Sequence, residues 1–214
     1  MLFRSERGLL ALSHDEVVHG KRSLFGRMPG DDWQRLANLR LLLAWQWTHP
    51  GAKLLFMGTE LANPDEWDHQ KSLPWDRLEL PSVQGLLHLI GDLNRLYREC
   101  AALHADDTNG QNLRFIACND ALRSVTVFER KDRDQRLVIV LNATPVVRER
   151  YTLGLPSPGV WQEIFNSDSR LYGGSDVGNL GAITARRDPA MGEPCSATIR
   201  LPPLSALILS ASRA

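Results

Sequence analysis

The segment GLLALSHDEVVHGK, residues 8–21, decides how this sequence should fold. It opens with a short apolar run, and a polar run beginning at Ser13 follows at once, as happens where a buried strand ends at an exposed loop. A second segment of this kind, KLLFMGTE, covers residues 53–60. Buried strands that open into polar loops are typical of parallel β/α units, in which reactive groups follow the carboxyl ends of the strands.

Each of these strands is followed by a segment with helical spacing. Asp31 directly precedes apolar residues that recur at helical intervals over residues 33–47, and an aspartate in that place caps a helix. A second amphipathic helix is predicted over residues 82–97. The order strand, helix, strand, helix predicts two β/α units, which together make up a first domain of residues 1–105.

The remaining residues, 106–214, lose the helical period and are predicted to form a second domain. Short segments of alternating apolar and polar residues, separated by Asn, Gly and Pro, predict an antiparallel β-sandwich. The predicted strands cover residues 113–117, 122–129, 136–141, 148–153, 160–165, 197–201 and 206–209. Residues 166–192, rich in Gly and Ser, are interpreted as an ordered but mobile surface loop. The charged run from Arg130 to Asp134 is interpreted as a solvated hairpin turn.

Charge and composition argue against several classes of function. The chain carries 25 Lys plus Arg and 25 Asp plus Glu, so it has no basic field that would attract a nucleic acid. No apolar run reaches the roughly 20 residues of a membrane span, and the first seven residues lack the order of a secretory signal. A cytoplasmic protein is therefore expected. Cys100, Cys118 and Cys195 are far apart and are expected to be free thiols.

His14 and Asp15 are the strongest candidates for chemistry. A carboxylate beside an imidazole at a strand end can hold sugar hydroxyls through charge-assisted hydrogen bonds, which strengthen as an oxocarbenium-like state develops. A zinc site of the H-E-x-x-H type does not fit, because His14 and His19 are five residues apart, about 140° of helical rotation. A purely structural pair, in which Asp15 caps a turn, stays open as the alternative.

Several motifs, taken in order, resemble one enzyme family. They are HDEVVHGK at residues 14–21, MPGDDW at 28–33, LLFMG at 54–58 with Glu60 after it, and the pair Glu66 and Trp67. These motifs are similar to the late barrel segment of bacterial glycogen (1,4-α-glucan) branching enzymes, which belong to the α-amylase superfamily. The resemblance implies an α/β plus all-β fold: the last two β/α units, seventh and eighth, of a (β/α)8 barrel, followed by a C-terminal antiparallel β-sandwich.

The resemblance also implies roles for single residues. Asp15 would match the family's third catalytic carboxylate, which stabilises the transition state, and His14 would match its substrate-contacting neighbour. Glu60 and Trp67 would contact the α-glucan, while a solvated loop acid and a packing tryptophan are the simpler interpretations of these two. No metal and no organic cofactor is implied.

The implied reaction cuts an α-1,4-glucan, such as glycogen or amylose, and transfers the freed chain to a 6-hydroxyl. In this family the nucleophile and the acid/base lie on earlier barrel strands, so the chain is expected to be a C-terminal fragment, inactive alone, whose partner is the N-terminal part of the barrel. Two alternatives stay open: another superfamily hydrolase such as an amylase, and a non-catalytic module that binds glucan or another subunit.

Overall fold

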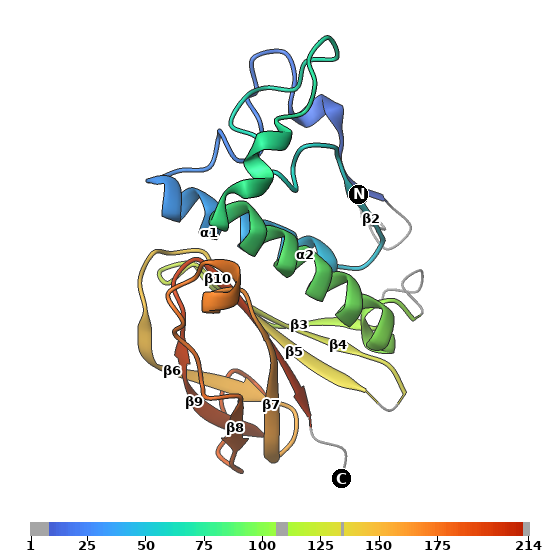
Figure 1. Ribbon diagram of the computed structural model, residues 1–214. Coiled ribbons are helices and arrows are strands. Elements are labelled where there is room, and N and C mark those ends of the chain that lie inside the picture. The colour runs from blue at the N-terminus through green and yellow to red at the C-terminus, as the bar shows by residue number, and fades with distance from the viewer. Residues whose placement is uncertain (1–8, 106–110, 134, 212–214) are drawn as a thin grey trace.

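The computed structural model describes residues 9–105, 111–133 and 135–211, and it places two helices between a small parallel sheet and a larger antiparallel part (Figure 1). The parallel sheet pairs β1 (Leu9–Leu12) with β2 (Ala52–Leu55). α1 (Asp32–Thr48) follows β1, and α2 (Pro81–Glu99) follows β2. The predicted order of strand, helix, strand, helix is therefore present.

The start of α1 is fixed by the residue that the sequence indicated. The Asp31 carboxylate accepts a hydrogen bond from the Gln34 backbone N–H at 2.8 Å, and the Gln34 side chain accepts one from the Asp31 N–H at 3.1 Å. This reciprocal capping box satisfies two of the N–H groups that every helix start leaves unpaired. At α2, Pro81 occupies the first helical turn, where its missing N–H costs nothing.

Replacing Asp31 by Ala should destabilise the chain by about 1 kcal/mol, because the cap is lost while the helix keeps its sequence. The free energy of unfolding, measured by urea denaturation, checks this value. Asp32→Ala is the matched control, since that carboxylate is 87% exposed and, among the described residues, pairs only with Arg35 at 3.4 Å. An equal loss in both variants would contradict the cap.

The strands after residue 111 are all antiparallel. They are β3 (Leu113–Asp120), β4 (Val125–Lys131), β5 (Arg136–Asn142), β6 (Arg148–Leu155), β7 (Gly159–Asn166), β8 (Ala182–Ala185), β9 (Cys195–Leu201) and β10 (Ser205–Ala211). A six-stranded sheet has the order β3-β4-β5-β10-β7-β8, and β6 pairs with β9 separately. All seven predicted strands are found, although β4 begins later than predicted because Leu122 lies in a turn and is 99% exposed.

One strand was missed. β8 lies inside residues 166–192, for which the sequence predicted a surface loop, and it pairs with β7 through residues such as Ile183 opposite Trp161. The same segment is anchored by Asp168, a buried residue whose carboxylate accepts hydrogen bonds from the Ser175 hydroxyl at 2.6 Å and the Val177 N–H at 3.2 Å. The interpretation of the whole segment as loop was wrong, because a four-residue strand amid glycines has too few alternating residues to be recognised.

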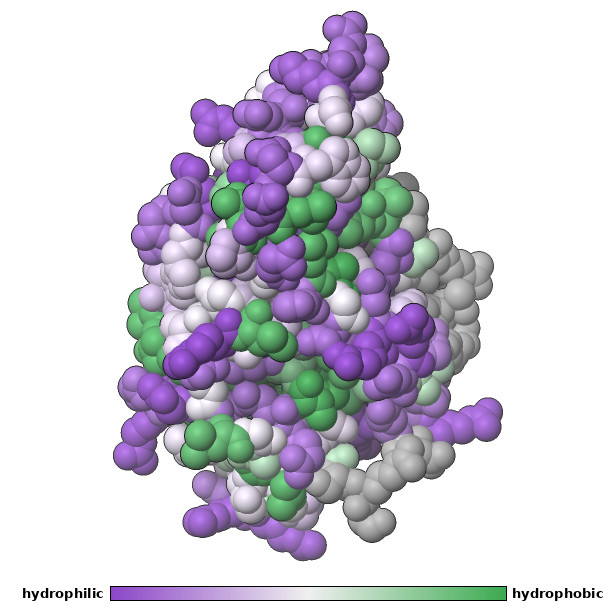
Figure 2. All heavy atoms as spheres, in the orientation of Figure 1, coloured by the Kyte–Doolittle hydropathy of each residue, from purple (hydrophilic) through white to green (hydrophobic). Residues whose placement is uncertain are grey.

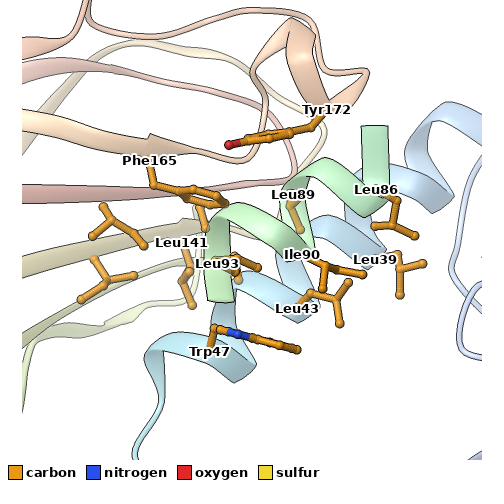
Figure 3. Packing of buried hydrophobic residues seen from close by; sticks show 14 of the residues in the cluster. Leu39, Leu43, Trp47, Leu86, Leu89, Ile90, Leu93, Leu141, Phe165 and Tyr172 are labelled. Atoms are coloured by element: carbon orange, nitrogen blue, oxygen red, sulfur yellow. The ribbon is translucent and has the colours of Figure 1, made fainter. Parts of the chain in front are cut away.

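Both faces of the six-stranded sheet are covered. Along β5, Leu137 and Ile139 pack against the helices, while Val138 and Val140 pack against β6 and β9 on the other face. Figure 3 shows the helix side of this core, where Leu93 of α2 lies beside Leu141 of β5. Alternating residues of a strand point to opposite faces, so β5 is apolar from Leu137 to Leu141 because neither face meets water there.

Two arginines join the helices to the antiparallel part. Arg130 in β4 is fully buried and donates to the backbone oxygens of Thr48 at 2.7 Å and Leu103 at 3.0 Å. Arg40 in α1 donates to the Ser167 oxygen at 3.0 Å, and burial lowers the pKa of its guanidinium to about 10, an effect that Asp168 partly offsets. The interpretation of Arg130 as part of a solvated turn was wrong, because a guanidinium can be buried when carbonyl oxygens satisfy it.

The proposed division between residues 105 and 106 falls at residues 106–110, which lie outside the described residues, as does Asp134. Within the described ranges the three cysteines are free, with Cys100 and Cys195 buried and Cys118 exposed. Neither α1 nor α2, nor any shorter helix in the described part of the chain, has the length and apolar character needed to cross a membrane.

Candidate functional site

The candidate site lies where the chain leaves β1 and β2. Because these strands are parallel and Leu12 lies opposite Leu55, the loops that follow them start at the same edge of the sheet. The first loop turns immediately into a short 3-10 helix, η2 (His14–Glu16). Figure 2 shows mainly hydrophilic side chains over this end of the molecule. The fold thus collects polar groups from two loops at one exposed edge.

His14 and Asp15 form an open pair on η2. His14 Nε2 lies 3.1 Å from Asp15 Oδ1, and the two side chains are 57% and 71% exposed. A pair so exposed contributes little to stability, because water screens its attraction. Within the described residues the Asp15 carboxylate has no other polar side-chain partner, so its remaining lone pairs face solvent and are available to a ligand.

An aromatic row links the two loops. The ring of His14 lies 6.3 Å from that of Phe56, and Phe56 meets Trp67 edge-on at 5.3 Å between centroids. Trp67 in turn lies 6.3 Å from His69. The backbone N–H of Trp67 donates to the Val17 oxygen at 3.0 Å, which ties the Trp67 loop to the residues just after η2. His14, Asp15 and Trp67 are therefore brought to one site.

Glu60 is placed differently. It follows β2 in a tight turn, in which the Asn63 N–H donates to the Gly58 oxygen at 3.2 Å. The residue is partly buried, and its Oε2 atom is buried without a hydrogen-bond partner in the described part of the chain. No hydrogen bond joins it to the described residues His14, Asp15 or Trp67. A buried carboxylate oxygen without a protein partner calls for a water molecule or a ligand hydroxyl to satisfy it.

Two residues that were quoted only as members of motifs, without a role of their own, organise this edge. The Glu66 carboxylate accepts hydrogen bonds from the backbone N–H groups of Gly20 at 2.8 Å and Arg22 at 3.2 Å. Lys21, which lies between them, donates from Nζ to the backbone oxygen of Asp15. The available signal was Gly20, which adopts φ +82°, because a turn with positive φ directs its N–H groups toward an anion.

Comparison with known proteins finds the same fold in a family model and in solved structures. Residues 115–212 match the family described as alpha amylase, C-terminal all-beta domain. A solved alpha-amylase from Anoxybacillus superposes with a TM-score of 0.59 at 17% identity, over 96% of this chain and 38% of that chain. The alpha-amylase of Geobacillus thermoleovorans gives a TM-score of 0.52 at 16% identity, over 82% of this chain and 33% of that chain. At these identities the likeness shows the fold alone.

Sequence comparison reaches further. The chain is 50% identical over 96% of its length to "1,4-alpha-glucan branching enzyme GlgB 1" of Xanthomonas axonopodis pv. citri, of which it covers 29%. It is 49% identical to the Burkholderia thailandensis branching enzyme, in an alignment that covers 97% of this chain and 25% of that enzyme. It is 48% identical to the Myxococcus xanthus branching enzyme, in an alignment that covers 95% of this chain and 28% of that enzyme. The chain thus spans between a quarter and a third of the length of these relatives. Residues 115–212 thus match an alpha-amylase C-terminal all-beta domain, and the chain as a whole is homologous to part of the 1,4-alpha-glucan branching enzymes.

Proposed function

We propose that residues 1–214 form the part of a cytoplasmic branching enzyme that supplies the transition-state stabiliser Asp15 and the sugar contacts around it. The single observation that carries this proposal is the His14–Asp15 pair at the carboxyl edge of β1 and β2, within a chain 50% identical to a named branching enzyme. The substrate would be an α-1,4-glucan. The reaction would transfer a cut chain to a 6-hydroxyl, without metal or organic cofactor.

The proposed chemistry follows from the charge and exposure of the site. A retaining transfer builds positive charge on the sugar at the cleaved bond, and a fixed carboxylate near that sugar stabilises the charge. Asp15 would take this role, and His14 would donate a hydrogen bond to a hydroxyl of the same sugar. Trp67 would pack its ring against a glucose unit, and the free oxygen of Glu60 would accept a hydroxyl hydrogen.

The remaining catalytic groups would come from a partner segment. β1 and β2 are the only parallel strands among the described residues, and the sheet they form has an unpaired strand edge on each side. Parallel sheets are ordinarily covered on both faces and continued by further strands, whereas β2 is here only partly buried. This supports the proposal that β1 to α2 are the last two units of a barrel. Its earlier strands would carry the nucleophile and the acid/base.

A protein consisting of residues 1–214 alone should therefore neither branch nor hydrolyse amylose. Removing the nucleophile and the acid/base deletes the covalent route itself, and not merely a part of its rate. The absorption spectrum of iodine-stained amylose, followed during incubation with the purified chain, should not change. A spectral change that Asp15→Ala abolishes would contradict the proposal and would place a nucleophile inside this chain.

The positive test uses a chimera, defined as the Xanthomonas axonopodis pv. citri enzyme with its matching segment of 208 residues replaced by the corresponding residues of this chain. At 50% identity the buried contacts between the two parts should be largely kept. The chimera should shift the iodine spectrum of amylose as the parent enzyme does. A folded chimera that binds amylose without altering it would favour the non-catalytic module.

A further inference from the structure

We infer that Glu66 and Lys21 are positioning residues that hold Asp15 in place through the backbone, an inference that rests on the proposed function of Asp15. The carboxylate of Asp15 is 71% exposed and, among the described residues, is paired only with His14. Side-chain packing therefore cannot fix its direction. What fixes an exposed catalytic side chain is the backbone to which it is attached, so the groups that hold this peptide matter for the chemistry.

The first link in this arrangement is Lys21. Its ammonium donates to the backbone oxygen of Asp15, across the turn in which the Lys21 N–H itself donates to the Val18 oxygen at 3.3 Å. Within η2 the hydrogen bonds are made by the Glu16 and Val17 N–H groups to the oxygens of Ser13 and His14, which leaves the Asp15 oxygen to Lys21. An ammonium bound to this oxygen restrains the peptide that carries the Asp15 side chain.

The second link is Glu66. Its two oxygens accept from Gly20 and Arg22, the residues on either side of Lys21. Gly20 and Arg22 both have positive φ, at 82° and 64°, which directs their N–H groups toward the same anion. For Arg22 this conformation costs energy that the charge-assisted hydrogen bond offsets. Glu66 thereby sets the place from which Lys21 reaches Asp15.

The arrangement also couples the site to the neighbouring loop. Glu66 directly precedes Trp67, whose backbone N–H donates to the Val17 oxygen at 3.0 Å. Three hydrogen bonds thus fasten residues 17–22 to residues 66–67. These hydrogen bonds therefore fix Asp15, which follows β1, relative to Trp67, which lies in the loop after β2.

Amide hydrogen exchange on the chain of residues 1–214 tests the structural part. Glu66→Gln keeps one acceptor oxygen and replaces the other by a donor, so exchange at Gly20 and Arg22 should accelerate by about tenfold or more. The matched control is Asp68→Asn, because Asp68 lies in the same loop and its carboxylate contacts, in the described part of the chain, only its neighbours: the Gln70 N–H at 2.9 Å, Lys71 at 3.5 Å and His69 at 4.0 Å. Unchanged exchange at Gly20 and Arg22 in Glu66→Gln would overturn the inference.

Kinetics of the chimera test the functional part. Glu66→Gln and Lys21→Met should each lower kcat about tenfold with little change in KM or Tm, since a misplacement well under 1 Å already costs rate. Lys21→Arg should recover most of the loss, because a guanidinium also donates to a carbonyl oxygen. Because both residues act on one peptide, the double variant Glu66→Gln/Lys21→Met should lose little more than either single variant.

The Asp15→Asn background separates this inference from the proposed function. If Glu66 acts through Asp15, Glu66→Gln should cost about tenfold with Asp15 present and less than about twofold once Asp15 is Asn. An equal loss in both backgrounds would show a general structural role and overturn the inference, as would full activity of Glu66→Gln. Normal activity of Asp15→Asn itself would instead refute the proposed function.

Discussion

Replacing Asp15 by Asn in the chimera is expected to lower kcat at least about a hundredfold while the melting temperature stays nearly unchanged. Asparagine keeps the shape of the side chain and removes the charge that an oxocarbenium-like sugar would feel. The side chain is 71% exposed, so the fold loses almost nothing when its charge is removed. Initial rates of branching at saturating amylose, together with thermal unfolding, measure both quantities.

The opposite result has an equally clear meaning. A structural turn residue that is replaced would cost about 1 kcal/mol of stability and leave the chemistry alone. Asp65→Asn is the matched control, because Asp65 is an exposed carboxylate on the loop beside the same edge. Near-normal branching by a stably folded Asp15→Asn chimera would show that Asp15 is structural.

The second large effect concerns stability. Trp161→Ala should destabilise the chain by about 3–5 kcal/mol, because it empties a fully buried site between the six-stranded sheet and β6 with β9. The substitution also removes the indole N–H that donates a hydrogen bond to the Ser157 backbone oxygen at 3.1 Å. Denaturant unfolding of the chain checks the prediction.

The control for this variant is Trp75→Ala. Trp75 is 55% exposed, so its removal should change the free energy of unfolding by less than about 0.5 kcal/mol. A loss at Trp161 no larger than the loss at Trp75 would contradict the packing described for the antiparallel part.

Local pattern predicted most of the elements. Asp31 marked the start of α1, and alternation marked β6 and β9, because capping and period 2 are properties of short segments. The antiparallel character of residues 113–211 was also predicted correctly. The strand β8 was not, because its four residues lie between glycine-rich turns.

Features that depend on contacts between residues far apart in the sequence could not be predicted from local pattern. Arg130 looks like a surface residue until α1 supplies the Thr48 oxygen, 82 positions away, as its acceptor. The packing of the helices against the sheet was likewise not predicted, because the apolar residues of β5 indicate burial but not which element buries them. Such contacts arise from tertiary packing, which overrides local propensity.

The site shows the same division. His14 and Asp15 stood out because two unlike polar groups follow an apolar run, and the structure places them at the shared edge of β1 and β2. The roles of Glu66 and Lys21 depend on hydrogen bonds to backbone atoms, which carry no side-chain signal. Only the geometry of the folded chain reveals them.

If this chain completes the site of a branching enzyme, the chimera must form α-1,6 linkages. Proton NMR of amylose incubated with the chimera tests it most directly, because anomeric protons of α-1,4 and α-1,6 linkages resonate separately. We expect the α-1,6 signal to grow while the number of reducing ends stays nearly constant, and Asp15→Asn to suppress this growth. Release of reducing ends without any α-1,6 signal, from a folded chimera, would contradict it and identify a hydrolase.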